Sequence, residues 1–183
     1  NHPPTMNCTR HFFFALFLMT PAFAAEPVTT TPKLEILNKQ IEHNNSDAKA
    51  YSNRGYVLAL LGRKEEARKD LKKAVELKDD APMHNRAGWA YFNMGDYADA
   101  VREFEVSSKL SNFGAHYDYY SLVLGYWGTG DKTRALENYA KAVEKDPRLG
   151  EYKSLNERTA EWTPLERQAM HEIYVLWSKA WRP

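Results

Sequence analysis

The sequence predicts an all-α fold in which antiparallel helix pairs stack into a solenoid, and two observations carry this prediction. First, the block Gly62, Ala67 and Ala74 recurs 33 residues later and again 35 residues beyond that. Second, apolar residues inside each copy follow the three- and four-residue spacing of one helix face. A repeat of this length is typical of two-helix units that bury their apolar faces against one another. The equivalent residues are Gly95, Ala100 and Ser107 in the second copy and Gly130, Ala135 and Ala142 in the third.

The composition supports one globular core and argues against two classes of partner. The chain has 183 residues, of which 43% are apolar, and this is enough to bury a core. Arg10 is the only charged residue among the first 24, so the remainder carries 24 basic and 24 acidic residues and no net charge. Because nucleic acids and anionic membrane surfaces attract an excess of positive charge, we expect neither as a partner.

Residues 1–24 are predicted to contain a secretory signal peptide with its three parts, together with upstream residues 1–5. Met6 is the expected start, Arg10 is the basic part, and the apolar run Phe12–Met19 precedes a small-residue cleavage point after Ala24. Such a run makes ~12 Å of helix against a bilayer core of ~30 Å, so we expect no stable membrane span after cleavage. The expected location is periplasmic, in a Gram-negative bacterium, or secreted.

Cysteine usage agrees with export. Cys8 is the only cysteine, and it lies before the expected cleavage point, so the mature chain would carry no thiol. This excludes disulfides, thiol catalysis and cysteine-based zinc sites.

Residues 25–32, with three Thr and two Pro, are predicted to form a flexible linker.

The rest of the chain, 33–183, is predicted to form one domain that begins with a single helix. Leu34, Leu37 and Ile41 give that helix one apolar stripe, as expected for the second half of a repeat that caps the solenoid. The predicted segments are a cap helix over 33–44, repeats over about 48–80, 81–114 and 116–149, and a degenerate pair over 150–183.

The degenerate pair is predicted to consist of helices over 151–161 and 164–181. Thr163 is the expected N-cap of the second helix, and Glu166 closes a capping box with it. Apolar residues of this helix cover about half of its circumference, which is more than one neighbour requires. Burial within the monomer is the simplest interpretation. The alternatives are closure of a groove and a homo-oligomer contact through 164–181.

Large and small residues also recur at matching positions of the three copies. They are Tyr51, Gly55, Leu58, Ala67, Leu71 and Ala74 in copy one, Gly88, Tyr91, Ala100, Phe104 and Ser107 in copy two, and Tyr119, Leu122, Tyr126, Ala135, Tyr139, Ala142 and Pro147 in copy three. This pattern resembles the tetratricopeptide repeat family over about residues 48–149, and it departs from the family pattern at Arg54, His84 and Val123. The resemblance implies a right-handed superhelical solenoid with an N-terminal half-repeat and C-terminal capping helices. It also implies that the first helices line a concave surface.

No motif for catalysis stands out, and we expect a protein that is not an enzyme and has no cofactor or metal. His116 lies in no recognisable nucleophile setting, and His171 lacks the second histidine of a zinc-protease helix because Val175 stands in its place. The glycines over 125–130 are better explained by a helical turn than by a phosphate loop, because no Lys follows the last glycine.

The concave surface implied by the resemblance is the predicted binding site. Its aromatic rings would supply contact area and its asparagines would bond a peptide backbone. The alternative is that some of these rings fill the space between repeats. Asn53 and Arg86 match two positions of the family's carboxylate clamp, but Pro82 stands where a Lys is needed, so the clamp is incomplete. The candidate site residues are Tyr56, Asn85, Trp89, Phe92, Asn93, Tyr117, Tyr120 and Trp127.

Together these observations predict an exported, non-enzymatic adaptor that binds a protein or peptide partner in an aromatic concave groove. Two other functions are compatible with the sequence. Aromatic faces also stack on sugar rings, so a receptor for a small ligand or glycan is one alternative. An inhibitor or immunity-type partner of another exported protein is the other.

Overall fold

The computed structural model describes residues 27–114 and 116–180, and all regular structure within them is helical. The predicted all-α solenoid of helix pairs is confirmed. The predicted signal peptide over 1–24 lies outside the described residues. The helices are α1 (Pro27–His43), α2 (Ala48–Leu60), α3 (Lys64–Leu77), α4 (Ala81–Met94), α5 (Tyr97–Leu110), α6 (His116–Gly128), α7 (Lys132–Lys145), the 3₁₀ turn η1 (Pro147–Gly150), α8 (Tyr152–Arg158) and α9 (Pro164–Ala180).

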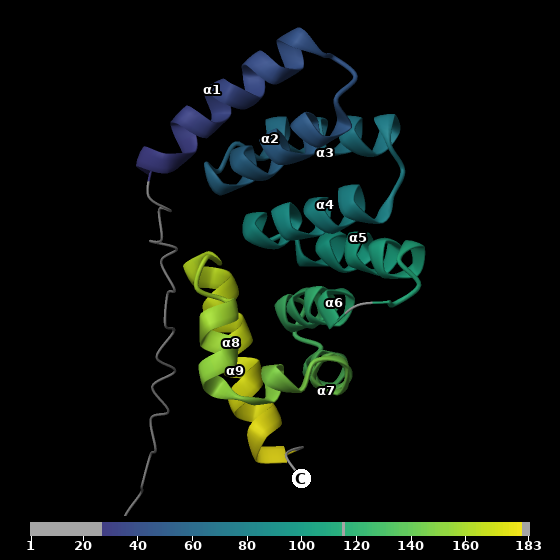
Figure 1. Cartoon of the computed structure of the whole chain (residues 1–183), viewed down its shortest axis with the longest axis vertical. Coiled ribbons are helices and arrows are strands. Elements are labelled where there is room, and N and C mark those ends of the chain that lie inside the picture. The colour runs from purple at the N-terminus through teal and green to yellow at the C-terminus, as the bar shows by residue number, and fades with distance from the viewer. Residues whose placement is uncertain (1–26, 115, 181–183) are drawn as a thin grey trace, which may run out of the picture.

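Helices α2 to α7 form three antiparallel hairpins stacked along the long axis of the molecule (Figure 1). Within the hairpins α2 packs on α3, α4 on α5 and α6 on α7, and neighbouring hairpins meet through α2 with α4 and α5 with α6. Each hairpin turns at a glycine in the left-handed region, with φ of 73° at Gly62, 80° at Gly95 and 82° at Gly130. Glycine adopts this conformation without steric cost, which explains why glycine recurs there.

Small residues allow the two helices of a hairpin to approach closely. A Cβ added at Gly55 would lie 2.8 Å from the Leu71 side chain, and one added at Gly88 would overlap the Phe104 ring. Larger residues at these positions would push the helices apart. The recurring alanines Ala67, Ala100 and Ala135 are each 0% exposed.

Two charged residues that depart from the repeat pattern form polar ties between helices. Arg54 on α2 donates two hydrogen bonds to Asp70 on α3, at 2.6 and 2.9 Å. His84 on α4 places its ring nitrogens 2.7 Å from Glu103 and 2.8 Å from Asp79. Burial of His84 opposes its protonation, but the two carboxylates outweigh this effect and raise the pKa of the imidazole above its ordinary value. Both residues therefore serve the packing of the repeats.

The N-terminal helix is longer than predicted. Helix α1 begins at Pro27 rather than Lys33, so the linker expected over 25–32 is helical from Pro27 onward. Pro27 occupies the first position of the helix, where proline is tolerated, whereas Pro32 lies inside it, where proline removes a backbone hydrogen bond. Leu37 and Ile41 are buried, as their predicted stripe requires.

The C-terminal unit, defined here as η1, α8 and α9, lies beside the lower half of the hairpin stack (Figure 1). Helix α8 ends at Arg158, earlier than predicted, and α9 packs on α7 and α6. The Tyr139 hydroxyl donates to the Leu149 carbonyl at 2.8 Å, and its ring lies 5.4 Å from Trp177. The wide apolar face of α9 is divided. Its buried members are Ala169, Met170, Ile173, Tyr174 and Trp177, and its exposed members include Leu165 and Leu176.

Candidate functional site

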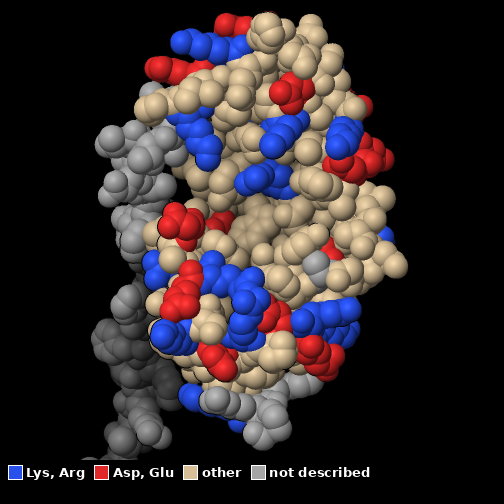
Figure 2. Space-filling view, viewed as in Figure 1, with Lys and Arg blue, Asp and Glu red and all other residues tan. Residues whose placement is uncertain are grey.

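A cavity of about 540 Å³ lies between the first helices of the three hairpins and the tip of the C-terminal unit. In the space-filling view this side of the molecule is hollowed near mid-height, with Lys and Arg side chains above the hollow and acidic side chains at its left edge (Figure 2). The cavity is lined by Tyr56, Ala81, Pro82, Asn85, Arg86, Trp89, Ser107, Tyr117, Glu161, Trp162 and Glu166. Helices α2, α4 and α6 all contribute, so this is the concave surface of the solenoid.

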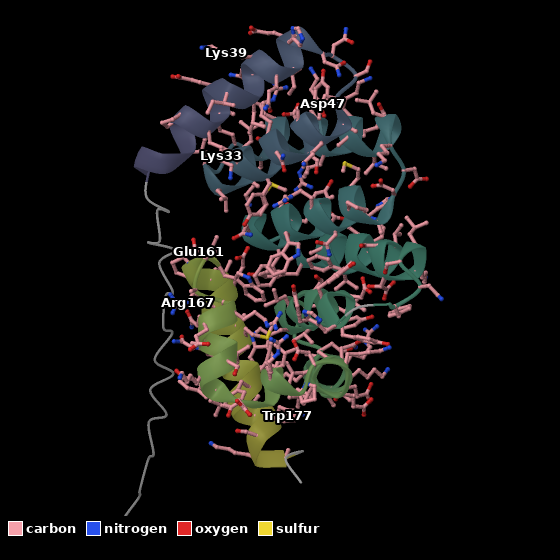
Figure 3. All side chains as sticks on the ribbon, in the orientation of Figure 1. Lys33, Lys39, Asp47, Glu161, Arg167 and Trp177 are labelled. Carbon is pink, nitrogen blue, oxygen red and sulfur yellow. The ribbon has the colours of Figure 1, made fainter. Side chains whose placement is uncertain are left out.

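The cavity has one exposed cation and one exposed anion on different elements. Arg86 projects from α4, where its guanidinium carbon lies 5.3 Å from the centre of the Tyr56 ring. This cation–π contact holds the charge beside the cavity without neutralising it. Glu161 belongs to the loop between α8 and α9, at the end of the C-terminal unit that points toward α1 (Figure 3). The cavity is therefore suited to a ligand that carries charge of both signs.

Aromatic rings form the inner wall of the cavity. Trp162, just before α9, lies edge-on to Trp89 at 4.9 Å between ring centroids and 5.5 Å from Tyr120. Trp89 also contacts the buried ring of Phe104, 6.0 Å away. Perpendicular and tilted aromatic pairs at these distances are favourable contacts. The C-terminal unit is thus joined to the concave surface through Trp162.

A buried carboxylate makes the second connection between the C-terminal unit and the concave surface. Glu166 is 1% exposed, and its Oε1 accepts hydrogen bonds from Asn93 Nδ2 at 2.6 Å and from the Tyr56 hydroxyl at 3.3 Å. Its Oε2 accepts from the Thr163 backbone N–H at 2.8 Å, while the Glu166 N–H donates to Thr163 Oγ1 at 3.3 Å. This is the geometry of the predicted capping box, which here also binds the groove.

Burial is the largest influence on the pKa values of Glu166 and Tyr56. It raises the pKa of the Glu166 carboxyl above its ordinary value, against the hydrogen bonds from Asn93 and Thr163 that favour the ionised form. Burial, together with the nearby Glu166, also raises the pKa of Tyr56, so its hydroxyl stays protonated and available as a donor. The concave surface thus binds the Glu166 carboxylate with two uncharged donors, the Asn93 amide and the Tyr56 hydroxyl.

The structure divides the eight predicted site residues into three groups. Four line the cavity: Tyr56, Asn85, Trp89 and Tyr117. Asn93 and Tyr120 instead contact the C-terminal unit, through Glu166 and Trp162. The last two, Phe92 and Trp127, lie elsewhere.

Phe92 and Trp127 correct the predicted groove. Phe92 is 1% exposed and packs in the main core, 5.3 Å from Tyr97, so it does not face a partner. Trp127 lines a separate cleft of about 220 Å³ beside Leu165 of α9. The prediction used the position of each residue in the repeat, which does not show that the cavity ends where α9 crosses the surface.

Sequence reasoning missed Trp162 and Glu161, and it gave Glu166 only a local role. Thr163 and Glu166 form the predicted capping box, but helix capping alone does not reveal contacts made 70 or more residues away. The width of the apolar face of α9 was the available signal, and groove closure was one of its interpretations.

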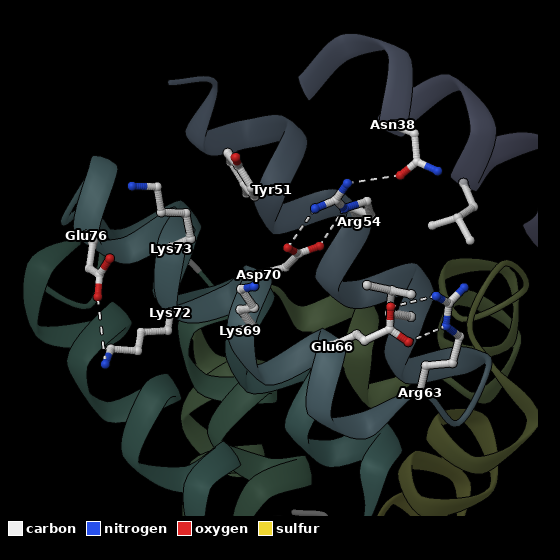
Figure 4. A pocket seen from close by; sticks show the side chains of 12 residues that line it. Asn38, Tyr51, Arg54, Arg63, Glu66, Lys69, Asp70, Lys72, Lys73 and Glu76 are labelled. Carbon is white, nitrogen blue, oxygen red and sulfur yellow. Dashed lines mark hydrogen bonds and ion pairs between the residues drawn. The ribbon is translucent and has the colours of Figure 1, made fainter. Parts of the chain in front are cut away.

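A second cavity, of about 560 Å³, lies at the N-terminal end among α1, α2 and α3 (Figure 4). Its charged side chains largely pair with each other. Arg54 bonds Asp70 and also donates to Asn38 Oδ1 at 2.9 Å, and Arg63 pairs with Glu66 at 2.6 Å. We therefore regard the concave cavity as the better candidate for binding.

His116 and His171 each lie beside a side chain of the C-terminal unit. His116 Nε2 lies 3.0 Å from Arg158 Nη1, and burial together with this cation lowers the pKa of the imidazole. The His171 ring lies 5.4 Å from Tyr152.

In residues 27–114 and 116–180, no group of three or more His, Cys, Asp or Glu is placed to hold a metal ion. Over the same residues, no helix combines the length and apolarity needed to cross a membrane.

Comparison with known proteins identifies the repeats. The tetratricopeptide repeat model matches residues 48–80 and again residues 81–111. The photosystem I assembly protein Ycf3 of Prochlorococcus marinus (strain MIT 9211) is 34% identical over 70 residues, which are 37% of this chain and 40% of that protein. Human tetratricopeptide repeat protein 13 is 32% identical over 108 residues, 58% of this chain and 12% of that protein. The chain thus spans less than half the length of these relatives.

Solved structures of two other proteins share the fold. TTC0263, a thermophilic TPR protein in Thermus thermophilus, has a TM-score of 0.59 and 23% identity, covering 72% of this chain and 71% of its own. MamA 41-end from Desulfovibrio magneticus RS-1 has a TM-score of 0.56 and 20% identity, covering 84% of this chain and 88% of its own. These likenesses show a shared fold, and the two matches over residues 48–111 identify this chain as a tetratricopeptide repeat protein.

Proposed function

We propose that this protein is an exported, non-enzymatic adaptor that binds an extended peptide segment of a partner protein in the concave cavity. Tetratricopeptide repeats mediate binding of protein partners, and the repeats support that general role here. The observation that carries the specific proposal is the cavity of about 540 Å³ between α2, α4, α6 and the C-terminal unit.

The walls of the cavity favour a peptide. Its volume lies within the ~300–1,000 Å³ typical of ligand sites. Trp89 and Tyr117 offer aromatic faces for apolar side chains, and Tyr117 is 45% exposed. Arg86 and Glu161 supply charges of opposite sign, which would select acidic and basic side chains of the peptide and fix its direction.

Selection from a random peptide library displayed on phage tests this proposal with the full chain as bait. We expect selected peptides to lose at least about tenfold in affinity when Arg86→Ala or Tyr117→Ala is introduced, because both side chains line the cavity. The matched control is Lys72→Ala, since this lysine lies outside the concave cavity with its side chain 79% exposed.

Two outcomes would contradict the peptide-binding role. One is an affinity that falls equally in the cavity variants and in Lys72→Ala. The other is a library from which no peptide is enriched, which would favour the small-ligand or glycan alternative.

The export part of the proposal rests on residues 1–24 and has its own test. Expression of the chain from Met6 in a Gram-negative host should give a periplasmic protein whose first residue is Ala25. Mass spectrometry of the fractionated protein measures this directly. An uncleaved chain in the cytoplasmic fraction would contradict export.

A further inference from the structure

Residues 161–166, called here the inserted segment, occupy part of the concave surface in the manner of a bound peptide. Trp162 inserts its ring against Trp89 on α4 and Tyr120 on α6, at centroid distances of 4.9 and 5.5 Å. The ring is therefore bound by two different hairpins. This is how an aromatic anchor of a partner would be held in a groove.

Hydrogen bonds also hold the inserted segment on the concave surface. The Asn93 amide donates to Glu166 Oε1 at 2.6 Å and its carbonyl accepts from Thr163 Oγ1 at 3.1 Å, so both ends of the amide are used. The Tyr56 hydroxyl reaches the same carboxylate oxygen at 3.3 Å. The groove thus presents an aromatic site and, beside it, a carboxylate site with neutral donors.

The inserted segment and the anchor of the C-terminal unit are separate along the chain: the segment ends in the first turn of α9, and the anchor lies further along that helix. The anchor consists of Met170, Ile173 and Trp177, which are 5% exposed or less and belong to the main core. The inserted segment precedes them and includes only the first turn of the helix. Burying the carboxylate of Glu166 also opposes insertion, because a buried charge loses its hydration. Trp162 packs at the edge of the same core, and the three anchor side chains would keep the C-terminal unit on the solenoid if the segment were released.

We propose that the inserted segment is a displaceable plug, and that the partner peptide carries an aromatic residue and a carboxylate that replace Trp162 and Glu166 in the groove. This inference rests on the proposed function and adds the chemistry of the partner to it. It also explains the position of the plug beside the open cavity, since a peptide bound there would extend directly into the sites that the plug vacates.

A labelled peptide with the sequence of residues 159–170 tests the plug, with fluorescence anisotropy as the measurement on the full chain. We expect Trp162→Ala to bind this peptide at least about tenfold more tightly than the wild type, because the substitution weakens the internal competitor. Tyr152→Ala is the matched control. This aromatic belongs to the same C-terminal unit, is 53% exposed and does not line the cavity, so its removal should leave binding at the wild-type level.

A second peptide, with Ala at the positions of Trp162 and Glu166, should not bind any of the three proteins. Equal affinity of the 159–170 peptide for wild type and Trp162→Ala, or no binding to a folded Trp162→Ala protein, would overturn the inference. If Trp162→Ala does not fold, hydrogen exchange of the wild type decides the matter. Excess peptide should then speed exchange of the amides at 161–166, and unchanged exchange would overturn the inference.

The library-selected peptides separate this inference from the proposed function. If they bind with dependence on Arg86 while the 159–170 peptide does not bind, the plug fails and the peptide-binding role stands. If the selected peptides bind less tightly to Trp162→Ala than to the wild type, Trp162 is a wall of the site and not a plug. If no peptide of either kind binds, both proposals fail.

Discussion

The close contact of α4 with α5 predicts that Gly88→Ala destabilises the protein. A Cβ at this position would lie 2.5 Å from Cε1 and 3.0 Å from Cγ of Phe104, well inside the ~3.5–4.0 Å of normal carbon contact. Phe104 is 0% exposed, so its ring has no free space into which it can move. Either the ring leaves its rotamer or α4 moves away from α5.

The expected magnitude is the difference between two effects. Overpacking a core costs about 1–3 kcal/mol, whereas Ala is favoured over Gly in a helix by about 0.5–1 kcal/mol. Because the added Cβ would lie within 3.0 Å of a buried ring, the upper part of the overpacking range applies, about 2–3 kcal/mol, and we expect Gly88→Ala to lower the free energy of unfolding by about 1–2.5 kcal/mol. For a domain of this size that corresponds to a melting temperature about 2–10 °C lower.

Thermal melting followed by circular dichroism at 222 nm measures this effect. Gly125→Ala is the matched comparison: its added Cβ would lie 3.0 Å from Val101 and 3.2 Å from Phe104, so we expect a smaller loss. Combining Gly88→Ala with Phe104→Leu should cost less than the sum of the two single changes, since the smaller side chain leaves room for the methyl group. A Gly88→Ala protein as stable as the wild type would refute the packing argument.

Three further predictions concern stability. Phe92→Ala should cost about 3–5 kcal/mol in chemical denaturation, because the ring is a core residue, and a loss below about 1 kcal/mol would contradict its burial. Tyr139→Phe removes the hydrogen bond to the Leu149 carbonyl and should cost about 1–2 kcal/mol in the same assay, whereas an unchanged midpoint would show that the bond contributes nothing. The pKa of His84 is raised by hydrogen bonds that include Glu103, so its contribution to stability is present below the unfolded pKa of about 6.5 and is lost as pH rises through the folded value. The melting temperature of the wild type should therefore fall more than that of His84→Gln between about pH 6 and pH 9, and parallel curves would contradict this.

The repeats were predictable from sequence because their constraints are local and recur. Gly62, Gly95 and Gly130 all need a positive φ, and residues such as Gly88 must be small to admit a neighbouring helix. These requirements leave the same residue types at the same spacing in each copy. The start and end of a helix are less constrained, and α1 consequently begins at Pro27, well before the predicted Lys33.

The groove was only partly predictable because its shape depends on contacts between distant segments. Of the residues predicted from their position in the repeat, Tyr56, Asn85, Trp89 and Tyr117 line the concave cavity. The same rule cannot show that Trp162 fills the space between two hairpins. That contact depends on how α9 packs on α6 and α7, which is set by apolar side chains throughout the C-terminal unit.

Hydrogen exchange with mass spectrometry, with and without a library-selected peptide, tests the role of the concave surface most directly. We predict slower exchange at the ends of α4 and α6 that border the cavity and faster exchange at residues 161–166, since the peptide would cover the former and displace the latter. Protection confined to α1 and α3, around the cavity that contains Arg54 and Asp70, would contradict the account and place the binding surface at the N-terminal end of the solenoid.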